Sequence, residues 1–442
     1  MQIEGRFMDE LIAKDANPGA RGAATGATAG TASTGAAGEA MRHAGPAAIE
    51  AALTAGRARL LALFEGFRAA LGPQGLRIAR DAAVNLPLWE LGHVGWFEEV
   101  WVARNTDRSS GAEADPLAAR TASVLEGADA FYDSSAVAHA TRWHLALPDV
   151  DATRAYLDAV RASTLALLRA SGSSDRALYF FRLALFHEAM HCEAWHFMAQ
   201  RLGLDLGPAM QRPGPGARPT AVATGDWRVP AGRRRIGTTA PGFAFDNELG
   251  AHEIDLDAFA IDRAPVAWAD FLPFVEAGGY ADAAAWTPAG RDWLRRVGAT
   301  APAHLRRGAH GWERETFGRW RPLDPAAPAC HLTTHEAEAW CRWAGRRLPT
   351  EAEWETAATL ATPADGFAWG EVWEWTASAF APYPGFAPHP YRDYSQPWFD
   401  GRRVLRGGSF ATAPWLRHPR YRNFFPEERS DVFAGFRSCA RP

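Results

Sequence analysis

The sequence has 442 residues but only one lysine, Lys14, and only 4 cysteines. The cysteines show no CxxC spacing and are too few to cross-link a chain of this length, which predicts a reduced, cytoplasmic protein. No run of 18 apolar residues occurs, so we expect no membrane-spanning helix and no membrane partner. The N-terminus also lacks the basic and apolar segments of a secretory signal.

A strong excess of positive charge is also missing, since the formal net charge is −4 at pH 7. Nucleic-acid-binding proteins usually carry such an excess, so we expect no nucleic-acid partner. Apolar residues make up 47% of the chain, which is enough for substantial cores, and the length suggests more than one domain. These features favour an intracellular protein with more than one domain.

Four regions follow from the pattern along the chain. Residues 1–45 are rich in Ala, Gly and Thr and are predicted to be a disordered tail. Residues 46–206 show helical periodicity at 49–71, 88–103, 151–170 and 175–202, with a further helix expected from Asp115. These helices predict an up-and-down bundle, the kind of fold that builds metal sites between facing helices.

The rest of the chain has a different character. Residues 207–225 are rich in Gly and Pro and are predicted to be a linker. Residues 226–442 combine short apolar runs, frequent Gly and Pro and one clear helix, at 334–343. This pattern predicts an α+β domain with long loops, and long loops in a compact domain are usually functional.

Three histidines in the helical half form a candidate metal site. His187 and His191 lie four residues apart on one predicted helix, so they share a face and can bind one ion. His93 lies on the predicted helix 88–103, which can face the first helix in a bundle. Three imidazoles on one side of a metal leave the other side open, as oxygen-activating iron requires.

The same segment also permits a zinc peptidase. His187, Glu188 and His191 spell the HExxH motif, in which the glutamate is the general base. The extended metalloprotease motif would have Gly at position 194 and His at position 197, where this sequence has Ala194 and Phe197. A distant glutamate ligand would still complete such a site, so the motif by itself leaves peptidase chemistry open.

The C-terminal half contains many pieces of one family pattern in one order. These pieces are Val229–Gly232, Phe245–Glu248, Ala258–Asp262, Phe274–Tyr280, Gly345–Glu355, Gly370–Trp375, Val404–Ser409 and Gly435–Arg437. On these pieces the C-terminal half resembles the formylglycine-generating-enzyme-like domain, which has a C-type-lectin-like fold, and the helical half resembles the DinB-like bundle. This pair of domains is typical of ergothioneine-biosynthetic sulfoxide synthases and selenoneine synthases, and it argues against a peptidase.

The resemblance implies an Fe(II) cofactor held by the three histidines. It also implies three small-molecule partners: hercynine (the betaine of histidine), a thiol or selenol donor, and O₂. Tyr391 matches the tyrosine that supplies a proton during O₂ activation, and Tyr394 one that helps to hold hercynine. Arg422 and Asn423 resemble the pair whose asparagine binds the hercynine carboxylate.

Departures from the pattern bear on the donor. Where the synthases that use γ-glutamylcysteine have glutamine, this chain has Met190; where they have Asn-Trp-Asp, it has Asn423, Phe424 and Phe425. Of two close arginines only Arg142 is evident. Because a donor with two carboxylates favours arginine partners, these losses predict a less charged donor such as a selenosugar. The alternatives are an ergothioneine-type synthase with a thiol donor, the zinc peptidase, and a binding module without catalysis.

Overall fold

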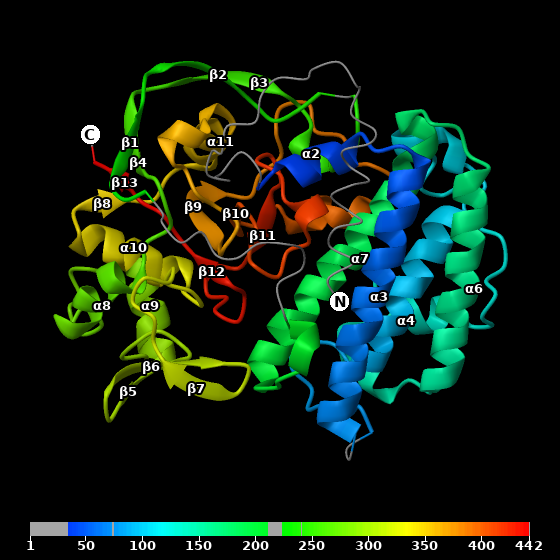
Figure 1. The fold of residues 1–442 in the computed structure, drawn as a ribbon, viewed down its shortest axis with the longest axis horizontal. Coiled ribbons are helices and arrows are strands. Elements are labelled where there is room, and N and C mark those ends of the chain that lie inside the picture. The colour runs from blue at the N-terminus through cyan, green and yellow to red at the C-terminus, as the bar shows by residue number, and fades with distance from the viewer. Residues whose placement is uncertain (1–33, 73–74, 211–222, 240, 442) are drawn as a thin grey trace, which may run out of the picture.

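The computed structural model describes residues 34–72, 75–210, 223–239 and 241–441. A helical bundle and a mixed α/β half lie side by side (Figure 1). The expected two-part architecture, a helical bundle followed by an α+β domain, is therefore present. Among the described helices, none has both the length and the apolar character needed to cross a membrane.

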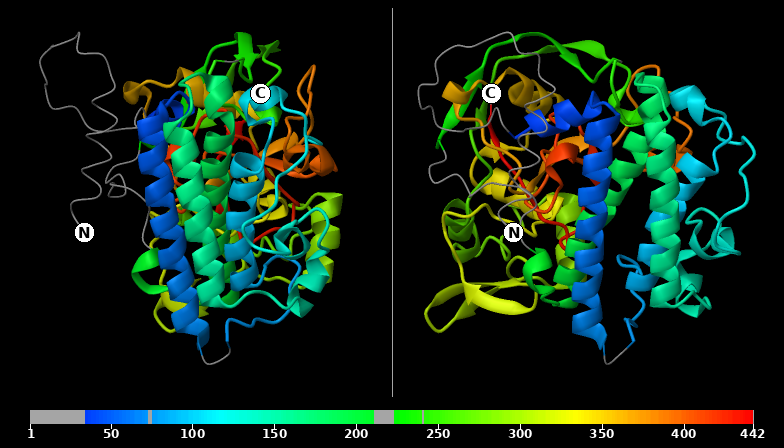
Figure 2. Two further views of the ribbon diagram at one scale, coloured as in Figure 1. Left: turned by 90° about the vertical axis from the view of Figure 1, so that its right-hand side faces the viewer. Right: turned by 45° about the vertical axis from the view of Figure 1, so that its right-hand side comes forward.

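The long helices of the bundle run roughly parallel to one another (Figure 2). Their bounds agree with the predicted spans to within a few residues. The last helix begins and ends at the predicted residues, 175 and 202. That helix begins after Ser174, whose side chain caps the amide of Ala177, and it ends at Gly203 in the left-handed conformation, with a φ of 64°. The bundle consists of α3 Pro46–Leu71, α4 Pro87–Glu98 with its π-helical extension η3 Glu99–Ala103, the short α5 Ala128–Tyr132, α6 Val150–Arg169 and α7 Asp175–Leu202.

Two predictions for this half are wrong. Residues 34–45 are not disordered, because they include helix α2, Ala36–Arg42, whereas residues 1–33 lie outside the described part. Arg42 anchors α2 through a two-pronged ion pair with the buried Glu248, at 2.5 and 2.8 Å. No helix starts at Asp115, because its Oδ1 accepts the amide of Leu117 at 2.9 Å and makes a local turn.

The predicted linker, residues 207–225, is partly described. It begins with the 3₁₀ turn Gly207–Met210, while residues 211–222 lie outside the described part. The first strand of the C-terminal half starts directly after it, at Asp226.

The C-terminal half is built on small sheets. One has the strand order β1-β4-β13-β8 and another the order β11-β10-β9-β12, with the hairpin β2-β3 and the sheet β5-β6-β7 beside them. The helix predicted at 334–343 is present as α10, and three further helices were not predicted. Those helices are α8 Trp268–Glu276, α9 Pro288–Val297 and α11 Glu351–Leu360. The remaining elements are α10 Thr334–Trp343, β1 Asp226–Val229, β2 Gly232–Ile236, β3 His252–Leu256, β4 Phe259–Asp262, β5 Leu305–Gly308, β6 Gly311–Thr316, β7 Arg319–Pro322, β8 Arg346–Arg347, β9 Trp373–Ala379, β10 Arg403–Arg406, β11 Asn423–Phe425, β12 Ala434–Gly435 and β13 Cys439–Ala440.

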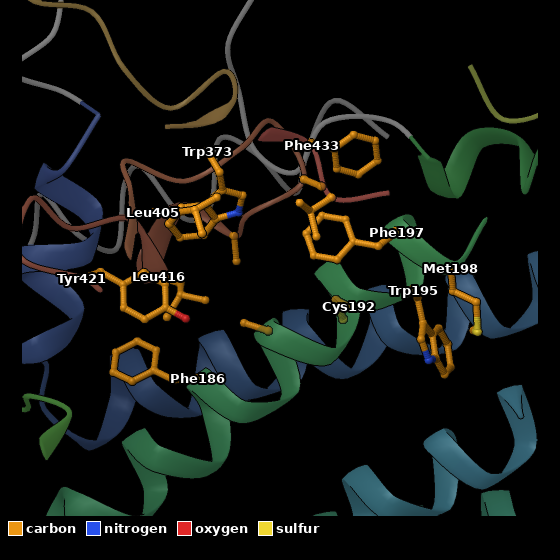
Figure 3. Close-up of a cluster of buried hydrophobic side chains, with 14 of the residues drawn as sticks. Phe186, Cys192, Trp195, Phe197, Met198, Trp373, Leu405, Leu416, Tyr421 and Phe433 are labelled. Atoms are coloured by element: carbon orange, nitrogen blue, oxygen red, sulfur yellow. The ribbon is translucent and has the colours of Figure 1, made fainter. Parts of the chain in front are cut away.

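Helix α7 belongs to both halves of the molecule. Its side chains Phe186 and Phe197 lie among Trp373, Tyr421 and other core residues of the C-terminal half, in one continuous hydrophobic cluster (Figure 3). On the same helix the buried Glu193 accepts hydrogen bonds from Trp373 at 2.8 Å, Ser409 at 2.5 Å and Thr412 at 2.7 Å. The helix that carries two of the candidate ligands is thus fixed to the second domain.

Candidate metal centre

The three histidines of the sequence motif meet between two helices. His93 projects from α4, and His187 and His191 project from adjacent turns of α7. One ring nitrogen from each lies within 4.8 Å of the other two, and the Nε2 atoms of His187 and His191 are 3.2 Å apart. Two nitrogen ligands at right angles on one metal, each ~2.1 Å from it, would lie about 3 Å apart. The spacing therefore suits a shared ion.

The opposite ring nitrogens hold two of these imidazoles in place. His93 Nδ1 lies 2.8 Å from the backbone oxygen of Tyr132, and His191 Nδ1 lies 2.9 Å from Glu90 Oε1. Since both partners are acceptors, Nδ1 carries the proton and Nε2 presents its lone pair to the centre of the site. Metal-binding histidines characteristically show such a carboxylate or carbonyl behind the ring.

His187 is held differently. Its Nδ1 has no hydrogen-bond partner, but its ring stacks on Phe97 with centroids 3.5 Å apart and an interplanar angle of 4°. Burial lowers the pKa of His187 well below its ordinary value and that of His93 to about 3, with the neighbouring His191 adding to both shifts. These imidazoles are therefore neutral near pH 7, the form that binds a metal.

Glu188 takes no part in this site. Its carboxylate pairs with Arg57 at 2.9 Å and with Arg161 at 3.0 Å, and both arginines also bind the buried Glu98. The four side chains join α3, α4, α6 and α7 in the bundle core. A glutamate held by two arginines is poorly suited to act as the general base of a zinc peptidase.

The predicted tyrosines approach the histidines from the C-terminal half. The ring of Tyr391 lies 6.3 Å from that of His187 and 4.9 Å from Phe97, and Tyr394 lies 6.1 Å from Tyr391. Both are on the long loop between β9 and β10. Burial raises the pKa of both phenols above the ordinary value, so both are protonated at neutral pH.

The other predicted pocket residues fall into two groups. Phe424, next to Asn423 on β11, stacks on Phe380 with centroids 4.0 Å apart, and its ring lies 6.4 Å from that of Tyr394. Phe425 points the other way along the strand and lies 6.2 Å from Phe197 of α7. Met190, one residue before His191, is half-buried against the core. Phe424 is thus adjacent to the tyrosine side, while Phe425 packs further along α7.

Two comparisons with family models cover most of the chain. Residues 213–371 and 366–442 match the sulfatase-modifying factor enzyme 1-like domain, and residues 52–194 match the DinB superfamily. The chain is 33% identical over 405 residues to the hercynine oxygenase of Mycolicibacterium smegmatis, with 79% of this chain and 90% of the relative covered. The corresponding protein of Mycobacterium tuberculosis is 32% identical over 405 residues, with 81% and 91% covered. The chain belongs to the hercynine oxygenase family.

Membership of this family confirms the predicted fold class and shows that the chain is an oxidoreductase. It thereby excludes the alternative of a binding module without catalysis. A formylglycine-generating enzyme of Streptomyces coelicolor is 29% identical over 286 residues and covers 49% of this chain. Formylglycine-generating enzymes match between 35% and 49% of the chain, whereas the hercynine oxygenases span both domains.

Arg142, one of the predicted substrate-binding residues, is engaged with other parts of the protein. Arg142 is expected to bind substrate, but its Nη atoms contact Asn85 at 2.8 Å and the backbone oxygens of Ser134 and Val137 at 3.4 and 3.3 Å. Its guanidinium also stacks on Trp89, 3.8 Å from the ring centroid. A direct ion pair between Arg142 and a substrate would disturb these contacts.

Three side chains around the histidines were not predicted from the sequence. Glu90 orients His191, Phe97 stacks on His187, and Trp89 stacks on His93 with centroids 4.9 Å apart. Glu90 lies three residues before His93 on the same helix, so its position one turn away was a usable signal. Nothing in the sequence pointed to the backbone oxygen of Tyr132.

Proposed function

We propose that this protein is a non-haem iron(II) enzyme that uses O₂ to join the imidazole carbon of hercynine to the selenium of a selenosugar. A C–H and an Se–H bond are replaced by a C–Se bond, which releases two electrons. Oxidation of the selenium releases two more. The four electrons reduce O₂, so that one oxygen atom ends on selenium and the other leaves in water.

The observation that carries the proposal is the face of three imidazoles beside a tyrosine. His93, His187 and His191 would hold the iron through Nε2, and a redox metal of this kind supplies one-electron chemistry for O₂ and open positions for substrates. The names of the relatives support hercynine as the substrate. Two immobilised substrates next to O₂ reduce the entropic barrier to a three-component reaction.

The aromatic loop supplies the remaining roles in this proposal. Tyr391 is the proton donor, because its phenol is protonated and its ring lies next to that of His187. Tyr394 and Asn423 contact hercynine, with Phe424 as an apolar wall beside them. The buried ring faces in this region suit a trimethylammonium group, which is attracted to aromatic rings.

The residues proposed to lie near the sulfur or selenium donor support a donor without charge. Phe425 presents an apolar ring, half-buried beside Phe197, and Met190 offers no strong hydrogen bond. Arg142 is bonded to protein atoms, and Arg429, whose guanidinium lies 4.9 Å over Phe425, is paired with Asp431 at 2.5 and 2.7 Å. A buried carboxylate without a partner costs several kcal/mol, so a neutral sugar is the better fit.

A thiol donor such as γ-glutamylcysteine is the second candidate. One observation favours it: Arg429 lies directly on Phe425, and a donor carboxylate that displaced Asp431 would gain a guanidinium partner. The two candidates differ only in the donor and share the metal, hercynine and O₂.

The deciding experiment is a donor competition. The iron(II)-loaded protein is incubated in air with hercynine and equal amounts of a selenosugar and γ-glutamylcysteine, and the products are identified by mass. We expect the C–Se product to exceed the C–S product at least ~10-fold, and Phe425→Asp to narrow that ratio. A dominant C–S product from the native protein would establish the thiol donor instead.

A further inference from the structure

The loop that carries Tyr391 and Tyr394 has little regular structure of its own. It connects β9 to β10 and contains only the short 3₁₀ turns Arg392–Tyr394 and Gln396–Trp398. A chain segment without ladder or helix hydrogen bonds keeps one conformation only if other groups hold it. The position of its tyrosines must therefore be set by side-chain contacts.

Those contacts concentrate on Ser395, the residue after Tyr394. Ser395 is fully buried, and its hydroxyl donates to Asp246 Oδ1 at 2.5 Å and accepts from Asn247 Nδ2 at 3.1 Å. With one bond given and one received, the hydroxyl is fixed in a single orientation. Next to it the Tyr394 ring stacks on Phe245, with centroids 4.4 Å apart. Two neighbours on the loop thus contact three consecutive residues, 245–247.

The part of the loop just before Tyr391 is held by the same carboxylate. The amide of His389 donates to Asp246 Oδ2 at 3.4 Å, and its ring nitrogen Nδ1 lies 2.9 Å from the hydroxyl of Tyr179 on α7. Asp246 is 2% exposed, so water competes little for these bonds. One buried aspartate therefore contacts both ends of the seven-residue segment that carries the two tyrosines.

Asp246 and Asn247 belong to the 3₁₀ turn η7, Asp246–Glu248, which also contacts the residue before Asn423. The backbone oxygen of Asn247 accepts from Arg422 Nη1 at 2.8 Å, directly before Asn423. Arg422 is itself paired with Glu351, with both bonds at 2.9 Å. The turn consequently fixes the tyrosine loop and the start of β11 with respect to each other.

We propose that Ser395, held by Asp246 and Asn247, is a positioning residue that fixes Tyr391 and Tyr394 against the histidine site. This inference rests on the proposed function for what the two tyrosines do there. Ser395 contacts neither hercynine nor the donor. It acts on turnover through Tyr391, so its removal should matter only while the Tyr391 hydroxyl is present.

The test compares Ser395→Ala with a matched control, Ser438→Ala. Ser438 is also fully buried and donates to an aspartate, Asp262, at 2.6 Å, but it lies at the sheet β13-β4 away from the loop. Hydrogen exchange on the metal-free proteins should show residues 389–395 exchanging at least ~10-fold faster in Ser395→Ala and unchanged in Ser438→Ala. Unchanged exchange in Ser395→Ala overturns the proposal.

A double-mutant cycle supplies the second readout. Ser395→Ala should lower the product formed per O₂ consumed ~10-fold in the native background and less than twofold in Tyr391→Phe. An equal loss in both backgrounds would show that Ser395 does not act through Tyr391. Asp246→Asn replaces one acceptor oxygen by an NH₂ group. It should likewise speed hydrogen exchange in residues 389–395 and lower the product formed per O₂ more in the native background than in Tyr391→Phe. If the native protein forms no product, the proposed function fails, while the exchange measurement still decides whether Ser395 fixes the loop.

Discussion

Replacing Glu90 tests whether the hydrogen-bond partner behind His191 affects the affinity of the site for iron(II). Glu90 is 3% exposed, and its carboxylate lies 2.9 Å from His191 Nδ1. In Glu90→Gln the amide oxygen still accepts this bond, but the negative charge behind the imidazole is lost. A hydrogen bond to a charged group contributes about 1.5–3 kcal/mol and a neutral one about 1 kcal/mol. The difference corresponds to roughly tenfold in affinity, within the range of about 10–100-fold for such partners.

The assay is an anaerobic titration of metal-free protein with iron(II) against a competing chelator. Glu99→Gln is the matched control, because Glu99 is a buried carboxylate directly after α4 that accepts from Tyr156 and Ser123 and contacts no candidate ligand. We expect Kd to rise ~10-fold in Glu90→Gln and to stay within twofold in Glu99→Gln. Equal affinities in all three proteins would refute the reasoning.

Four further outcomes are expected. His93→Ala should lose most of its bound iron, measured by metal analysis, and full iron content would remove His93 from the ligand set. Glu188→Gln should lower the free energy of unfolding by about 3 kcal/mol, because it breaks a buried ion pair, yet retain most of its turnover at a temperature where it is folded; loss of all turnover would point to a general base. Tyr391→Phe should keep iron and hercynine binding by calorimetry but divert O₂ toward oxidation of the donor, and unchanged products would exclude it from the reaction. Burial raises the pKa of Asp246 from 3.8 to about 6, so the fold disfavours the ionised carboxyl. The stability of the native protein relative to Asp246→Asn should therefore be greatest below pH ~4 and fall by up to about 3 kcal/mol as the pH rises to 6; parallel denaturation curves across this range would contradict that cause.

The sequence predicted the helices best where periodicity and end signals agreed. The spans 175–202 and 334–343 match α7 and α10, because apolar periodicity coincides with a capping Ser174 in the first and a capping Thr333 in the second. Helix α2 was missed because its stability depends on the ion pair between Arg42 and Glu248, two residues 206 positions apart. Such an anchor leaves no local trace in a segment rich in Ala and Gly.

For the site, sequence spacing identified the side chains that share one element but not their surroundings. His187 and His191 follow from a four-residue spacing on one helix, and His93 was placed near them by the expected bundle. The family resemblance, rather than spacing, identified Tyr391. Its loop is fixed by the hydrogen bond between Ser395 and Asp246, a tertiary contact between segments about 150 residues apart. Sequence periodicity carries no information about such pairs.

Because helix α7 serves both domains, separating the two halves would disrupt a shared core. It would bring Phe186 and Phe197 into water, at about 1.5–3 kcal/mol each, and would break the three bonds to Glu193. Reactants should therefore enter and leave while the two domains stay together. Crosslinking the two halves should then leave turnover intact.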